Sequence, residues 1–361
     1  MSHALRTRGL VIGRMPPGPT NSLTDVPGIL VGHATLIEGN SVRTGVTAIR
    51  PHAGDLVEQK LKAASIVLNG YGKPIGLSQV DELGVIETPI LLTSTMAVGK
   101  VADALVSWVL QRREDTSPPI TSLNPLVAEC NDSYLNDIQA RPVRTDHVFA
   151  ALESAHEGAV DEGAIGAGTG LSAFEWKSGI GSASRRIPLG GETFTVGALS
   201  LSNFGHREEL RIDGHPIGGW LRNVDRDPDA PSPGGSIVVV LGTDLPLSHR
   251  QLARVARRAG IGIARTGGTC HQTSGEFVIA FTTADPVPAD ASRILLEERR
   301  LNDAHRAIDP VFQAVIEAVE ESILCALFEA KTMTGFNGHR RAALPVEQVL
   351  ALLRAPGPAS A

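Results

Sequence analysis

A serine with the surroundings of a potential nucleophile stands at position 236, in the stretch PSPGGSIVVVLGTD (residues 231–244). The chain before it is acidic and rich in proline and glycine, whereas the IVVVL run after it is typical of a buried strand. A serine hydroxyl is a weak nucleophile unless a base lies beside it. The α-amino group of Ser236, with an ordinary pKa of about 7.7–8.0, would be that base if the Gly235–Ser236 bond were cut. Taken alone, a serine after Gly-Gly is more typical of a turn.

A second group of reactive side chains lies in GGTCHQTSGEFVIAF (residues 267–281), directly before another apolar run. Ser236, His271 and a carboxylate could form a catalytic triad, but triads are defined by geometry and not by spacing. In the simpler interpretation, Ser274 and Gly275 form a turn and Glu276 is a carboxylate at a strand edge. Both interpretations remain open from the residues alone.

Two further motifs carry weaker signals. The segment EGAIGAGTG (residues 162–170) is rich in glycine, but it fits neither GxGxxG nor a phosphate loop with a following Lys-Ser/Thr. Close backbone packing explains it better than nucleotide binding. The 11 histidines are scattered without an HExxH or HxH pattern, so we expect no metal site and no cofactor.

Composition excludes several classes of function. The 361-residue chain carries 33 basic and 39 acidic residues, and its net charge of −6 argues against nucleic-acid binding. The 3 cysteines are far apart and form no CxxC pair, which favours reduced thiols over disulfides. No apolar run approaches the roughly 20 residues of a membrane helix, and the N-terminal apolar run is too short for a signal peptide. These features predict a cytoplasmic enzyme or binding protein that does not associate with membranes.

The candidate residues must be positioned by strands and helices that the sequence pattern indicates. Several predicted strands follow one another without an intervening helix, which argues for packed sheets with helices outside them. Residues 225–235 are rich in proline and aspartate, and we expect an exposed, protease-sensitive linker there. The predicted strands are 28–36, 64–69, 89–93, 192–201, 236–241 and 276–283. The predicted helices are 97–115, 145–158, 248–264, 309–330 and 346–355.

Seven stretches distributed along nearly the whole chain resemble the self-processing aminopeptidases of peptidase family S58, which include L-aminopeptidase/D-esterase and the β-peptidyl aminopeptidases. They are NSLTDVPGILVGHATL, NGYGKPIGLSQVDELGVIETPILLTST, AECNDSYLNDIQ, EGAIGAGTGLSAFEWKSGIGSASR, LSNFGHREEL, GGSIVVVLGTDLPL and ARTGG. The resemblance implies a single α+β domain over residues 1–361, a four-layer αββα sandwich similar to that of N-terminal nucleophile hydrolases but with different strand connectivity. It also implies self-cleavage at Gly235–Ser236, giving an α-chain of residues 1–235 and a β-chain of residues 236–361.

The resemblance also implies catalytic roles for four residues. Ser236 is similar to the family's nucleophile, with its freed amine as the general base. Ser274 and Glu276 resemble the supporting pair, a hydroxyl that holds the amine and a carboxylate that orients it. Asn203, in LSNFG, resembles an oxyanion-hole donor, a role worth about 3–4 kcal/mol of barrier in other enzymes.

On the substrate side, the resemblance implies that Glu129 binds the ammonium group of the substrate. A second oxyanion contact is expected from Tyr134 or from Asn131. Cys130 and Ser133 differ from the threonine and glycine that the family pattern leads us to expect. The expected substrates are short peptides or aminoacyl amides and esters with a free amino terminus.

Other expectations and alternatives complete the sequence-based hypothesis. The resemblance implies a homo-oligomer, a tetramer of αβ units. One alternative is a processed acyltransferase similar to the ornithine acetyltransferases, although those use a threonine nucleophile. Another is an unprocessed relative that binds or assembles without catalysis.

Overall fold

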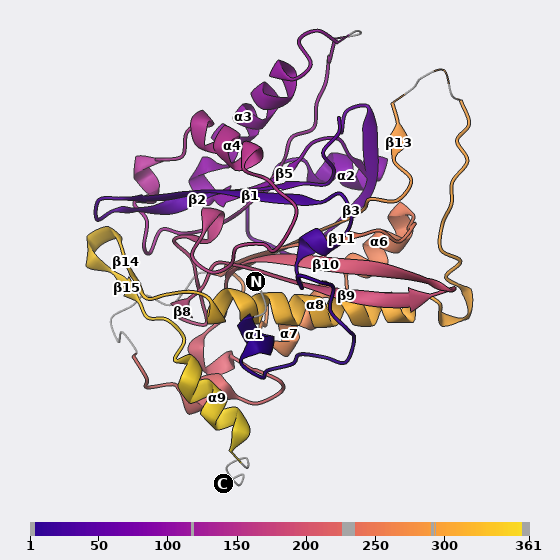
Figure 1. The fold of residues 1–361 in the computed structure, drawn as a ribbon. Coiled ribbons are helices and arrows are strands. Elements are labelled where there is room, and N and C mark those ends of the chain that lie inside the picture. Colours follow the sequence, from indigo (N-terminus) through magenta and orange to yellow (C-terminus); the bar gives the residue numbers. More distant parts are fainter. Residues whose placement is uncertain (1–3, 117–118, 226–234, 290–291, 293, 356–361) are drawn as a thin grey trace.

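A computed structural model describes residues 4–116, 119–225, 235–289, 292 and 294–355. Two β-sheets pack face to face, and helices cover the outer face of each (Figure 1). The predicted αββα sandwich is therefore confirmed. Most of the predicted linker 225–235 lies outside the described residues.

The first sheet has four strands and is covered by α3 (Val98–Gln111) and α4 (Thr145–Glu153). Its strand order is β1 (Leu30–Glu38), β2 (Val42–Arg50), β5 (Ile90–Ser94) and β6 (Leu126–Cys130). Apolar side chains such as Val101 and Leu105 of α3 pack with Val46 and Leu91 of the sheet. This cluster is the hydrophobic core between the first sheet and its helices.

The second sheet has seven strands and is covered by α6 (His249–Ala256), α7 (Ala259–Arg265) and α8 (Asp309–Phe328). Its strand order is β13 (Val287–Pro288), β3 (Gln59–Gly70), β12 (Gly275–Thr282), β11 (Ser236–Thr243), β10 (Glu192–Asn203) and β9 (Ile180–Leu189), with β4 (Val85–Ile86) paired to β3.

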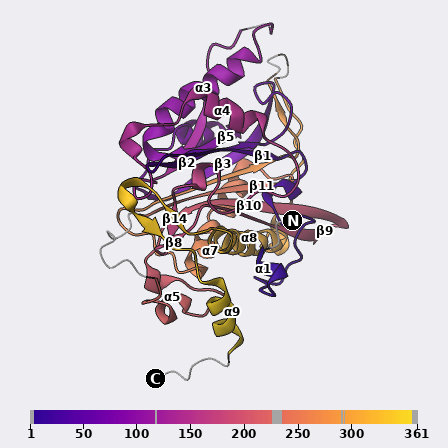
Figure 2. The same cartoon turned by 60° about the vertical axis from the view of Figure 1, so that its left-hand side comes forward.

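Smaller elements complete the fold and lie around the sandwich (Figure 2). They are α1 (Ala4–Thr7), α2 (Leu77–Leu83), α5 (Ile217–Trp220), α9 (Val346–Arg354) and the paired short strands β7 (Ser172–Ala173) with β8 (Trp176–Lys177) and β14 (Met333–Thr334) with β15 (Arg340–Arg341). Within the described part of the chain, no helix is both long and apolar enough to cross a membrane.

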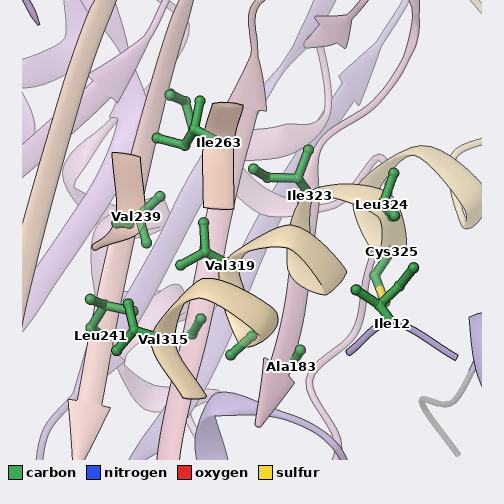
Figure 3. Packing of buried hydrophobic residues seen from close by; sticks show 14 of the residues in the cluster. Ile12, Ala183, Val239, Leu241, Ile263, Val315, Val319, Ile323, Leu324 and Cys325 are labelled. Atoms are coloured by element: carbon green, nitrogen blue, oxygen red, sulfur yellow. The ribbon is translucent and has the colours of Figure 1, made fainter. Parts of the chain in front are cut away.

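Strand β11 is buried on both faces, which explains why its sequence is a continuous apolar run. Val238 and Val240 point into the core between the two sheets. Val239 and Leu241 point the other way, towards Val315 and Val319 of α8 (Figure 3). Side chains alternate between the faces of a strand, so a run of β-branched residues fills both cores at once. The strand that begins at Ser236 is thus one of the most firmly packed elements of the molecule.

The predicted helix over 248–264 is divided in the structure, which corrects the sequence-based boundary. Helix α6 ends at Ala256 and α7 begins at Ala259. Glycine lowers helix propensity, and two glycines lie in α7. One of them, Gly262, allows close packing on α8, because a Cβ there would lie 2.8 Å from the Cβ of Val319.

Candidate active site

The strand register brings Ser236 together with residues from two neighbouring strands. Ser236 is the first residue of β11, and its antiparallel partner on β10 is Asn203. Its parallel partner on β12 is Gly275, which stands between Ser274 and Glu276. Three segments that are separated by at least 30 residues in the sequence therefore meet at one end of the second sheet. The four residues given catalytic roles by the sequence-based hypothesis lie within this group.

The hydroxyl of Ser236 is held in the site by the strand but forms no hydrogen bond with a described residue. Ser236 is 5% exposed, and its Oγ has no hydrogen-bond partner among the described residues. The carbonyl oxygen of Gly235 accepts a hydrogen bond of 3.2 Å from the backbone N–H of Gly275. A Cβ on Gly235 would lie 2.8 Å from Ser274 Oγ, so glycine allows that hydroxyl to approach the Gly235–Ser236 bond. A polarised carbonyl, a free hydroxyl and a second hydroxyl thus surround one peptide bond.

Ser274 and Glu276 form a buried hydroxyl–carboxylate pair. Ser274 Oγ donates to Glu276 Oε1, and both side chains are buried. Burial raises the pKa of the Glu276 carboxyl, while the hydrogen bond from Ser274 and the nearby His271 oppose the rise. A carboxylate with a raised pKa accepts protons more readily than an exposed one. The pair can therefore orient an amine and can also accept a proton.

Asn69, at the end of β3, fixes the turn that carries this pair. Its Nδ2 donates to the carbonyl oxygens of His271, at 2.9 Å, and of Ser274. The sequence-based analysis did not identify Asn69 as a site residue. Its position in NGYGK, at the end of an apolar strand, is the signal that could have indicated it.

Asn203 is held in an orientation that leaves one N–H of its side chain available. Its Oδ1 accepts from the backbone N–H of Ser172 at 3.1 Å, and its Nδ2 donates to the carbonyl oxygen of Asn131 at 2.9 Å. An amide nitrogen carries two N–H groups, so one can still donate to an oxyanion. Asn131 contributes here through its backbone, because its side-chain Oδ1 accepts from Ser133 N at 2.9 Å.

Glu129, near the end of β6, presents a buried carboxylate on the facing sheet. It accepts hydrogen bonds from Lys73 N, at 3.0 Å, and from the hydroxyl of Thr95. No cationic side chain is among these partners, so the carboxylate can receive the ammonium group of a ligand. The structure thus adds Lys73 and Thr95 to the surroundings of Glu129, and neither was identified from the sequence.

Cys130 follows Glu129 and lies beside the candidate nucleophile. Burial raises the pKa of its thiol well above the usual range. Its sulfur donates to the carbonyl of Leu201 at 3.4 Å. A neutral, buried thiol is a poor nucleophile, so Cys130 fills space behind Ser236 and does not compete with it.

The ring of Tyr134 packs between His339 and Arg341. Its ring stacks on His339, with centroids 4.6 Å apart, and Arg341 Cζ lies 3.7 Å from the ring centroid. The carbonyl of Tyr134 is 2.8 Å from His339 Nδ1. These contacts attach the 131–137 loop to the β14–β15 hairpin. They favour a structural role for the ring, and the oxyanion role of Tyr134 or Asn131 stays a prediction.

Two alternative interpretations find no matching geometry in the described residues. His271 Nε2 lies 2.9 Å from Glu209 Oε1, and its ring packs against His206, so it is not hydrogen-bonded to Ser236. In the segment 162–170, the carbonyl of Gly168 accepts from the buried ammonium of Lys177 at 3.3 Å. A phosphate loop would present N–H groups instead. In the described part of the chain, no group of three His, Cys, Asp or Glu side chains is arranged to hold a metal ion.

A serine at the start of a central strand of an αββα sandwich, flanked by an amide donor and a hydroxyl–carboxylate pair, defines a hydrolase of the N-terminal-nucleophile type. Comparison with known proteins specifies the group within that class. The sequence model that defines peptidase family S58 matches residues 21–341, and the chain belongs to this family.

Three relatives illustrate the similarity. The β-peptidyl aminopeptidase BapA of Sphingosinicella xenopeptidilytica is 37% identical, over 95% of this chain and 89% of the relative. The crystal structure of the PH0078 protein from Pyrococcus horikoshii OT3 matches with a TM-score of 0.91 and 48% identity, covering 97% of this chain and 98% of that one. The L-aminopeptidase D-Ala-esterase/amidase of Ochrobactrum anthropi, described as a variant of the Ntn hydrolase fold, matches with a TM-score of 0.91 and 36% identity, covering 97% of each chain.

Proposed function

We propose that this protein is a serine aminopeptidase that matures by cutting its own Gly235–Ser236 bond and then releases N-terminal residues from peptides, amides or esters. The observation that supports this most strongly is the position of Ser236. Its hydroxyl is buried and has no hydrogen-bond partner in the described part of the chain. It lies one residue after a hydrogen-bonded glycine carbonyl and between Asn203 and the Ser274–Glu276 pair. Membership in peptidase family S58 agrees with this chemistry.

Self-cleavage begins with attack of Ser236 Oγ on the carbonyl carbon of Gly235. The α-nitrogen of Ser236 is still an amide at this stage, so the base must come from elsewhere. The Ser274–Glu276 pair is adjacent and accepts the hydroxyl proton. The N–H of Gly275 stabilises the developing oxyanion. The C–N bond then breaks, its nitrogen takes up the proton, and water hydrolyses the resulting ester to free the Gly235 carboxylate.

The mature cycle uses the amine that this step releases. Ser236 Oγ attacks the substrate carbonyl, and the α-amine of Ser236 accepts the hydroxyl proton. The free N–H of Asn203 donates to the oxyanion. The proton passes to the leaving amine or alcohol, and water hydrolyses the acyl-enzyme through the same amine. Ser274 and Glu276 hold the amine in position throughout.

The substrate class follows from Glu129. A buried carboxylate that has no cationic partner among the described residues favours a substrate with a free ammonium group next to the scissile carbonyl. The names of the relatives refer to β-peptides and to L-amino acid and D-Ala substrates. The class that we propose is therefore defined by the free amino terminus of a short peptide, aminoacyl amide or ester.

Replacement of the nucleophile tests the proposal. We expect Ser236→Ala to remain one chain and to lose hydrolysis of aminoacyl p-nitroanilides, because both steps need the hydroxyl. Ser202→Ala is the matched control, since Ser202 is a buried serine on β10 whose Cα pairs with Ile237. It should process and hydrolyse like the wild type. Denaturing gels and p-nitroaniline release measure both effects, and processing or activity in Ser236→Ala would refute the proposal.

The setting in the cell is part of the same proposal. The three cysteines are free, which supports a reducing compartment, and we place the enzyme in the cytoplasm. Ile294 and Leu295 are 93% and 89% exposed, an exposure that favours coverage by another subunit. This supports the homo-oligomer of αβ units expected from the sequence, and its native mass would establish whether it is a tetramer.

A further inference from the structure

The segment that joins β3 to α2 forms one wall of the candidate site and is attached to it at three points. At its start, Gly70 pairs with Gly275 of β12. Towards its end, Ile75 and Val127 of β6 exchange backbone hydrogen bonds of 2.8 and 3.2 Å. Between them, Lys73 N donates to Glu129 Oε1 at 3.0 Å. Residues 70–76 are therefore held against β12, which carries Glu276, and against β6, which carries Glu129.

The glycines of this segment allow that close approach. A Cβ on Gly72 would collide with the ring of Phe277 and would lie 3.1 Å from Glu129 Oε1. A Cβ on Gly275 would lie 2.5 Å from the carbonyl oxygen of Tyr71. Tyr71 is thus packed next to the residue that pairs with Ser236, and Lys73 is packed next to the carboxylate that would bind the substrate ammonium.

The side chain of Lys73 brings a positive charge to this position. Its Nζ lies 5.0 Å from the centroid of the Tyr71 ring, a distance at which the ring attracts the ammonium. No carboxylate of the described residues forms an ion pair with it. By contrast, His271, another cationic candidate near the site, is already bound to Glu209. Lys73 is thus a cation at the rim whose charge is not neutralised by a described neighbour.

We propose that Lys73 binds the free carboxylate of the leaving residue, so that this aminopeptidase prefers dipeptides over the corresponding dipeptide amides. This inference rests on the function proposed above. A dipeptide carries its ammonium at one end and its carboxylate at the other, and its two residues span about 7 Å at full extension. Glu129 receives the first charge, and Lys73, whose own backbone N–H is bound to Glu129, presents its flexible four-carbon stem for the second.

The test compares a dipeptide such as β-Ala-Ala or Ala-Ala with the same dipeptide as its C-terminal amide. In the wild type we expect kcat/KM to be about tenfold higher for the free acid, as for one charge-assisted hydrogen bond. Lys73→Met should reduce this ratio to about one, through a higher KM for the acid. Lys73→Arg should keep most of the preference, and Lys73→Glu should reverse it. Lys100→Met, which removes a half-buried lysine of α3 instead, should retain the wild-type ratio.

Specific results would overturn the inference. A wild-type ratio near one, or an unchanged ratio in Lys73→Met, would show that the carboxylate is not bound by this residue. The wild-type ratio alone decides this even if a variant fails to fold. If the protein hydrolyses the acid and the amide equally well in a Ser236-dependent manner, the inference fails while the proposed function stands. If it hydrolyses neither, nor any aminoacyl p-nitroanilide, both fail.

Discussion

At the scale of single residues, the site separates into groups that already have hydrogen-bond partners and one that does not. Asn203, Ser274 and Glu276 are each fixed by contacts with neighbouring residues. The Oγ of Ser236 has no such partner among the described residues. A catalytic site holds its supporting groups in place and leaves the reacting atom free. The contacts around Ser236 follow that division.

Asn203 is expected to act in turnover more than in self-cleavage. The N–H of Gly275, and not Asn203, donates to the Gly235 carbonyl in the uncut chain. We therefore expect Asn203→Ala to cut itself but to lose about 10²–10³ in kcat, with little change in KM, as for other oxyanion donors. Ser202→Ala is the control, because it changes the preceding residue of β10 and leaves the amide of Asn203 in place. Steady-state kinetics of the purified variants measure the difference, and a loss confined to KM would count against the oxyanion role.

Sequence reasoning at this scale named the candidate catalytic residues but not the groups that form hydrogen bonds around them. Ser236, Ser274, Glu276 and Asn203 were named through the resemblance to the family, and the strand register brings them together. Asn69, Lys73 and the N–H of Gly275 were not identified. Their contributions come from a side-chain amide, a loop position and a backbone group, which depend on tertiary register and leave no pattern in the sequence.

At the scale of elements, the sequence pattern predicted strands that are rich in β-branched residues because both of their faces are buried. It missed strands that contain small, polar or charged residues. Strand β11 was predicted from IVVVL. Strand β9 was not, because it contains the small and charged run IGSASRR. In the structure, its glycine and small residues let α8 approach, and Arg185 forms a buried ion pair of 3.1 Å with Glu317. Strands β2 and β6 were likewise missed, the first because its sequence contains polar residues and glycine, the second because LVAEC contains a glutamate and a single β-branched residue.

The contact between β9 and α8 gives a prediction about stability. A Cβ on Gly181 would collide with the carbonyl oxygen of Ser322 and would lie 2.5 Å from Ala326 N. We expect Gly181→Ala to lower the free energy of unfolding by about 1–3 kcal/mol or more, the usual cost of overpacking. At Gly99, in α3, a Cβ would meet nothing within 4 Å, so Gly99→Ala should stabilise by about 0.5–1 kcal/mol. Urea unfolding of both variants provides the comparison, and equal effects would contradict this packing.

At the scale of the whole molecule, the two segments on either side of residue 235 are interleaved. Strands β11 and β12 come from the later segment, and they lie between β10 and β3 from the earlier one. Helix α8 packs on β9 and β10 across the same division, and Arg6 and Arg185 of the first segment both pair with Glu321 of the second. A cut at the Gly235–Ser236 bond, at the start of β11, leaves these hydrogen-bond ladders and cores intact. The processed protein should therefore remain one folded body.

The most direct test of the account is the intact mass of the active enzyme, measured under native and denaturing conditions on the same preparation. We predict equal amounts of two chains, residues 1–235 and 236–361, which separate only on denaturation, with the smaller chain beginning at Ser236. Brief incubation with a slowly hydrolysed aminoacyl ester should add the acyl mass to that smaller chain. An active preparation that consists entirely of the uncut 361-residue chain would contradict the central claim that Ser236 supplies both the nucleophile and its base.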